Sequence, residues 1–137
     1  LGMEFCANRA RNGLVNHPDG VLHERLNGKL AELNPHLVYE TAGDGDAAAE
    51  NLLAWAGHKL GCVLGAAVNL LDIRTIIVGG GVSAAGDFIL EPARETLPKF
   101  VVPGLRDDLH IQRETLGNEV GLLGAAQLAF EGRDSQV

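Results

Sequence analysis

Residues 51–97 read N-L-L-A-W-A-G-H-K-L-G-C-V-L-G-A-A-V-N-L-L, then D-I-R, then T-I-I-V-G-G-G-V-S, then A-A-G-D-F-I-L-E-P-A-R-E-T-L, and this stretch says most about the fold. Its first part is a long apolar run that predicts a helix. Gly57, Gly61 and Gly65 recur every four residues and so share one helix face. Each glycine destabilises a helix by roughly 1 kcal/mol relative to alanine. Three on one face therefore indicate that another helix or main chain lies very close.

A short β-branched run, Thr75–Val78, follows the apolar helix and is typical of a strand buried on both faces. The run ends in three glycines, Gly79, Gly80 and Gly81. A strand followed by a glycine-rich turn and a helix often brings main-chain N–H groups against a nucleotide. A tight turn with one positive φ would explain one glycine, so three in succession favour a ligand.

Other glycine motifs fit these residues less well. No Lys-Ser or Lys-Thr follows the glycines, so they do not form a P-loop. Gly79, Gly81 and Ala84 match the looser G-x-G-x-x-G/A dinucleotide fingerprint. That fingerprint needs an acidic residue about 20 positions later, where this chain has Lys99. A dinucleotide-binding fold therefore remains the weaker alternative.

The rest of the chain predicts one more strand and several more helices. Asn34 before a proline, and Asp46 before the long helix, have the side chains that cap helix N-termini. The last helix is apolar nearly all round, which predicts that it is buried, and Asn118 would cap it. Two strands alone make a marginal sheet, so we expect further strands before Leu1. The predicted helices cover residues 3–14, 22–33, 35–41, 83–97 and 120–130, and the second strand covers 109–113.

Composition limits the possible partners. The chain has 137 residues, 18 acidic and 11 basic, for a net charge of -7, and it has no basic run. This argues against nucleic acid or an anionic membrane as its partner. The apolar run before Asp72 is too short to span a bilayer. Cys6 and Cys62 lie in apolar contexts, which is typical of reduced thiols in a cytoplasmic protein.

Metal and nucleophile motifs are missing from the sequence. The five histidines form no H-x-x-H pair and the two cysteines no C-x-x-C pair, so we expect no metal site made by this chain alone. No G-x-S-x-G motif is present. The chain starts at Leu1 without an initiator methionine and within what looks like a structural element, so we expect it to be a fragment of a longer protein.

Three stretches carry a family resemblance: L-N-P-H-L-V-Y-E-T-A-G-D-G-D-A-A-A, L-G-x-x-L-G-A-A-V-N-L-L-D-I-R-T-I-I-V-G-G-G-V-S-A-A-G and L-G-N-E-V-G-L-L-G-A-A-Q-L-A. From about Gly2 to Phe130 the chain resembles the C-terminal half of the ROK family of glucokinase-like sugar kinases and sugar-responsive repressors. The resemblance implies an α/β fold: the helix-rich C-terminal part of an actin-like ATPase, ribonuclease-H-like lobe with few parallel or mixed strands. Residues 1–130 would form this part and 131–137 a polar tail.

The resemblance also assigns roles to individual residues. Gly79, Gly80, Gly81 and Val82 are similar to the segment that lies against the adenosine of ATP. Glu4 resembles the family glutamate that binds sugar hydroxyls, although its glycine stands two positions before it and not the usual three. A carboxylate in a first helical turn is equally explained by the helix dipole. Both readings of Glu4 therefore stay open.

The other residues needed for catalysis and for metal binding would lie before Leu1. The resemblance places there the catalytic aspartate, the phosphate loops, most Mg²⁺ ligands and a cysteine-rich zinc motif, so no catalytic residue is assigned in this chain. We expect a homodimer that uses ATP and Mg²⁺ on a sugar, and a glycine-lined helix that meets another helix across the moving interface between lobes. The alternative is the sugar-sensing half of a ROK-type transcriptional repressor, which would differ by an N-terminal DNA-binding region.

Overall fold

The computed structural model describes residues 9, 20–27, 29, 33–80 and 85–134. Of the helix predicted over residues 3–14, only Arg9 is among them. The elements are α2 (Val21–Leu26), α3 (Pro35–Gly43), α4 (Ala47–Leu71), β1 (Thr75–Val78), α6 (Asp87–Thr96), β2 (His110–Arg113) and α7 (Val120–Asp134), with short 3-10 helices η2 (Leu97–Phe100), η3 (Pro103–Leu105) and η4 (Gly117–Glu119).

Two of the three predicted caps, Asn34 and Asp46, are confirmed, and the cap predicted at Asn118 stays a prediction. Asn34 Oδ1 accepts the Leu37 N–H at 2.9 Å and begins α3. Asp46 Oδ1 accepts the Ala49 N–H at 2.9 Å and begins α4. The helix predicted over 22–33 is shorter than expected, because α2 ends at Leu26 and Asn27 takes a left-handed φ of 42°.

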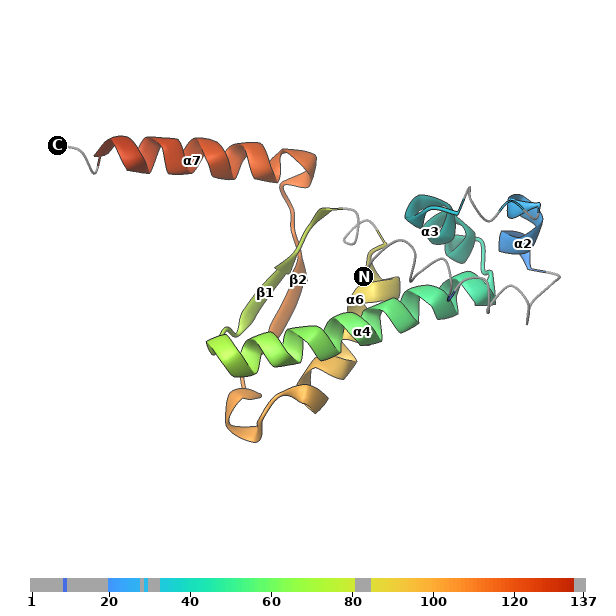
Figure 1. Cartoon of the computed structure of the whole chain (residues 1–137), viewed down its shortest axis with the longest axis horizontal. Coiled ribbons are helices and arrows are strands. Elements are labelled where there is room, and N and C mark those ends of the chain that lie inside the picture. The colour runs from blue at the N-terminus through green and yellow to red at the C-terminus, as the bar shows by residue number, and fades with distance from the viewer. Residues whose placement is uncertain (1–8, 10–19, 28, 30–32, 81–84, 135–137) are drawn as a thin grey trace.

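The two predicted strands form a parallel pair, with Ile76 opposite Ile111 and Val78 opposite Arg113. Figure 1 shows them side by side, rising from the C-terminal end of α4. One face packs on α4 and α6 through Ile76, Val78 and Ile111. The other face is open, and Ile77 is 63% exposed. The prediction of burial on both faces is wrong for this chain, since no described element covers that side.

Helix α4 belongs to two hydrophobic clusters. The first joins its N-terminal half to α2, α3 and the start of α6, and the second joins its C-terminal half to the strands, α6 and η2. Leu60 packs against both clusters and connects them. The sheet is thus packed against both α4 and α6.

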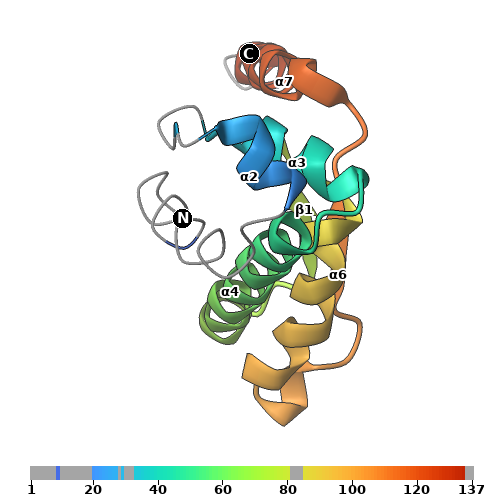
Figure 2. The ribbon, with the colours of Figure 1, turned by 90° about the vertical axis from the view of Figure 1, so that its right-hand side faces the viewer.

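The glycine face of α4 packs against α6 and η2 of the same chain, and both views of the ribbon show α4 and α6 side by side (Figure 2). An ideal Cβ on Gly61 would lie 2.7 Å from Thr96 Cβ and 2.8 Å from the Ala93 carbonyl oxygen. The close approach is confirmed. The expectation that this face meets a helix of another lobe is wrong for these glycines, because α6 and η2 already fill the space.

Helix α6 is shorter than the helix predicted over 83–97. It begins at Asp87 after Gly86, whose φ is 56°, and ends at Thr96. The turn then tightens into η2, which contains Pro98. Arg94 connects α6 to the outer edge of β2, since its Nε donates to the Ile111 carbonyl at 2.9 Å. Its Nη1 donates to Glu91 within α6 at 2.6 Å.

Helix α7 differs most from its prediction. Its side chains are exposed from Gly121 to Glu131, including Leu122 at 73% and Phe130 at 65%. The expected burial of this helix is wrong here, because no described element covers it. The helix also continues to Asp134, beyond the predicted end at Phe130. Even so, no helix among the described residues is long and apolar enough to cross a membrane.

Candidate functional site

The glycine turn lies where both strands end. Because β1 and β2 are parallel and in register, Val78 and Arg113 lie at the same edge of the sheet. Gly79 and Gly80 leave β1 there, and Glu114 leaves β2 beside them, with its N–H donating to the Val78 carbonyl at 3.0 Å. In α/β sheets, ligands bind outside the carboxyl ends of the strands. This edge is therefore the candidate site.

For two of the three glycines, packing or backbone conformation within the chain explains why the residue is glycine. An ideal Cβ on Gly79 would lie 3.1 Å from Glu114 Cγ, so a side chain there would press on Glu114. Gly80 has a φ of 69°, which favours glycine, and no described atom within 4 Å of its ideal Cβ position. Three successive glycines are thus weaker evidence for a ligand than the sequence alone indicates.

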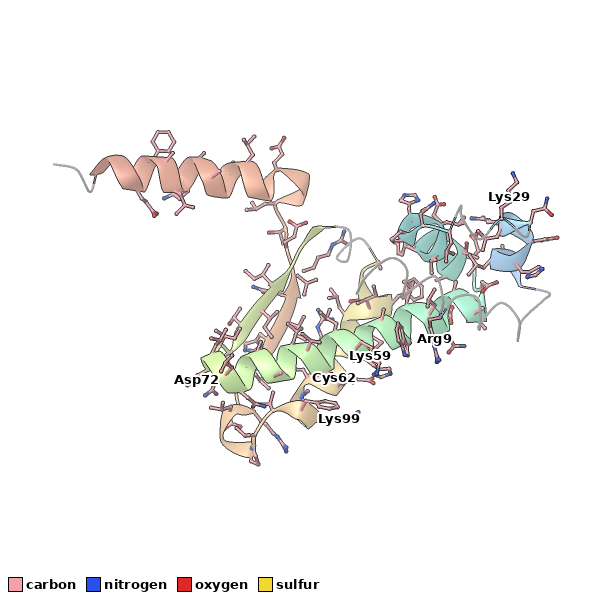
Figure 3. The ribbon with its side chains drawn as sticks, viewed as in Figure 1. Arg9, Lys29, Lys59, Cys62, Asp72 and Lys99 are labelled. Carbon is pink, nitrogen blue, oxygen red and sulfur yellow. The ribbon has the colours of Figure 1, made fainter. Side chains whose placement is uncertain are left out.

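The other predicted site residues are not placed. Gly81, Val82 and Glu4 lie outside the described residues. Arg9, near Glu4 in sequence, lies with its guanidinium carbon 5.5 Å from the centroid of the Trp55 ring on α4 (Figure 3). This cation–π contact is a packing feature and assigns no role to Glu4.

Glu114 also lies at this edge, although the sequence pattern does not predict it as a site residue. Its side chain is half-buried, and its Oε2 accepts the Gly117 N–H at 2.7 Å. It thereby closes the turn between β2 and η4 while lying against Gly79. A glutamate at the end of an alternating strand gives no local signal of this position, because the contact depends on β1.

The described residues offer little metal-binding chemistry. Among them, no group of three His, Cys, Asp or Glu side chains is arranged to hold a metal ion. Cys62 is a half-buried free thiol on α4. Asp72, labelled with Cys62 in Figure 3, lies at the opposite end of the strands from the glycine turn and pairs with Arg74 at 2.8 Å.

Comparison with known proteins gives consistent matches. The model of the ROK family matches residues 7–131. The glucokinase of Halalkalibacterium halodurans is 29% identical over 126 residues, which are 92% of this chain and 38% of that protein. A glucokinase of Streptomyces coelicolor is 40% identical over 81 residues, which are 58% of this chain and 24% of that protein.

Solved structures show the same fold. The ROK family glucokinase of Streptomyces griseus, in complex with glucose and AMPPNP, aligns with 90% of this chain and 40% of its own, at a TM-score of 0.76 and 27% identity. A ROK family transcriptional regulator, a homologue of the E. coli MLC protein, aligns with 79% of this chain and 26% of its own at a TM-score of 0.66. At 18% identity, that second likeness shows the fold alone. The chain spans about two fifths of the first curated relative.

Proposed function

The chain belongs to the ROK family, and on that premise we propose that it is the C-terminal part of an ATP-dependent sugar kinase of the glucokinase type. The observation that supports this best is the alignment of 90% of the chain with a glucokinase bound to glucose and AMPPNP. The chain has the helix-rich α/β architecture of the actin-like ATPase fold seen in that relative. The reaction would be transfer of a phosphoryl group from ATP to a hexose hydroxyl.

In this proposal the edge formed by Val78, Gly79 and Gly80 is the shelf for the adenosine of ATP, continued by Gly81 and Val82. The fit rests on the space at Gly80, where no described atom lies within 4 Å of an ideal Cβ. Phosphoryl transfer depends mainly on positioning and on neutralising charge with Mg²⁺. The described residues supply positioning only, so the base and the phosphate-binding groups would come from other parts of the protein.

The second proposed role, for α4 as a hinge helix between lobes, rests on the family resemblance. The glycine face does not support it, since α6 and η2 fill that face. Any hinge motion at α4 would have to use another face of the helix or its ends. Domain motions of this kind close many kinases around their substrates.

The second candidate function is the sugar-sensing half of a ROK-type repressor, favoured by the fold it shares with the MLC homologue. The two candidates differ in chemistry. A kinase turns over ATP in the presence of its sugar, whereas a repressor binds DNA in a sugar-dependent manner. Turnover of ATP with a hexose by the full-length protein supports the kinase, and sugar-dependent DNA binding without turnover supports the repressor.

The adenosine shelf is tested at Gly80. In the full-length protein we expect Gly80→Asn and Gly80→Val each to weaken ATP binding about tenfold, or about 1.4 kcal/mol, with sugar affinity unchanged. Asparagine tolerates a left-handed φ, so Gly80→Asn fills the space without the backbone strain that valine adds. Calorimetry with each ligand measures both affinities.

The control for this test is Gly104→Asn. Gly104 lies in η3, and its ideal Cβ also has no described atom within 4 Å. This variant should keep both affinities. Normal ATP affinity in Gly80→Asn, with weaker folding in Gly80→Val, would show that the glycine serves only the turn.

Glu4 is tested by its kinetics. If Glu4 binds sugar hydroxyls, Glu4→Gln should raise the KM for sugar or lower kcat while ATP affinity is kept. A helix-dipole role predicts normal kinetics and a loss of a few tenths to about 1 kcal/mol of stability. Glu50, an exposed carboxylate in the first turn of α4, is the matched control. A variant of Glu4 that behaves like Glu50→Gln would exclude the sugar contact.

A further inference from the structure

Glu114 occupies a defined position at the edge where the strands end. Its main chain is joined to β1 through Val78, and its Cγ lies 3.1 Å from the ideal Cβ position of Gly79. Its Oε2 is used by the Gly117 N–H at 2.7 Å. Its Oε1 makes no hydrogen bond to any residue that the structure describes. The carboxylate is thus held by one oxygen, on a side chain whose Cγ lies against Gly79.

The surroundings restrict what Oε1 of Glu114 can bind. A carboxylate that is ionised only accepts hydrogen bonds. Successive strand residues point to opposite faces, so the exposed Arg113 next to it does not share its face. A phosphate group placed against Glu114 would thus be repelled with no cation from β2 to offset it. The part of a nucleotide that suits this position is a neutral hydrogen-bond donor.

We propose that Glu114 is a specificity-determining residue of the nucleotide site and that its Oε1 accepts a hydrogen bond from a neutral donor of the nucleoside. The proposal rests on the proposed kinase function and names the residue that would recognise the nucleoside of ATP at this edge. The donors available on adenosine are the ribose hydroxyls and the exocyclic amine. Gly79 is required in this arrangement because a side chain there would press on Glu114.

The experiment compares ligands that each lack one donor. ATP, 2′-deoxy-ATP, 3′-deoxy-ATP and inosine triphosphate are titrated by calorimetry into full-length wild type and Glu114→Gln. Glutamine can still accept the Gly117 N–H with its amide oxygen, which leaves a nitrogen, a donor, in place of Oε1. The melting temperature of the variant should therefore stay close to that of wild type.

One analogue is expected to bind wild type about tenfold more weakly than ATP, as hydrogen bonds to charged groups allow. Glu114→Gln should bind ATP about tenfold more weakly and lose nothing further with that analogue. The analogue that shows the effect identifies the donor: a deoxy analogue points to a ribose hydroxyl and inosine triphosphate to the exocyclic amine.

Other outcomes overturn the inference. If wild type binds all four ligands equally, or if Glu114→Gln discriminates among them as wild type does, Glu114 does not contact the nucleoside. If Glu114→Gln loses affinity equally for all four and melts lower, its role is structural. If wild type binds ATP but does not distinguish it from the three analogues, the proposed function is retained and this inference is rejected. If wild type binds no ATP, the proposed function fails and this inference fails with it.

Discussion

Gly61→Leu is expected to destabilise the protein by roughly 1–3 kcal/mol, the usual cost of overpacking. The first added carbon would meet Thr96 Cβ at 2.7 Å and the Ala93 carbonyl oxygen at 2.8 Å, and the Leu97 nitrogen lies 3.1 Å away. Two of these atoms belong to main chain and cannot rotate aside. Helices α4 and α6 would have to separate, which opens the cluster that also holds the sheet. Urea denaturation followed by circular dichroism measures the loss.

The control for this prediction is Gly43→Leu. Gly43 is the last residue of α3, and its ideal Cβ has no described atom within 4 Å. The stability of this variant should remain close to that of wild type. Because the glycine face is filled within the chain, Gly61→Leu should lower stability while turnover per folded molecule stays normal. Lower turnover at unchanged stability would contradict this packing. It would support instead a contact between the glycine face and another lobe.

Asp46→Ala is expected to have the second large effect, a loss of about 2–4 kcal/mol. Asp46 is 5% exposed, and its carboxylate accepts two main-chain N–H groups, from Ala49 at 2.9 Å and from Leu22 at 3.0 Å. Loss of the helix cap costs about 1 kcal/mol. Leaving the buried Leu22 N–H without its acceptor costs about 1–3 kcal/mol more. The denaturation midpoint measures the sum, provided that the transition remains two-state.

Two further variants separate the cap from the contact with α2. Asn34→Ala removes the exposed cap of α3 and should cost about 1 kcal/mol. In Asp46→Asn the amide oxygen can still accept the Ala49 N–H, but the amide nitrogen, a donor, faces the Leu22 N–H. The stability of this variant should therefore lie between those of wild type and Asp46→Ala. If Asp46→Ala costs no more than Asn34→Ala, the bond to Leu22 contributes nothing measurable.

Part of the candidate site can be predicted from the sequence, and part of it cannot. The strand over 75–78 lies at the residues that the sequence predicts, because a β-branched run acts locally. Three successive glycines favour a ligand when the sequence alone is considered, but backbone conformation or packing within the chain explains two of them. Glu114 could not be found from the sequence, since its significance comes from Gly79, 35 positions away in the chain.

The sequence by itself determined the features that depend on near neighbours along the chain. These are the caps at Asn34 and Asp46, the long helix α4, the two strands and the close approach on the glycine face. Each follows from a repeat or a hydrogen bond that spans only a few residues.

Only the tertiary structure decided which surfaces meet. It placed α6 and η2 on the glycine face, and it gave Asp46 a second bond to Leu22, 24 positions away in the chain. It also left Ile77 and the apolar side of α7 exposed, against the predicted burial. The physical reason is that periodicity shows which side of an element is apolar, whereas burial depends on a second element that covers that side.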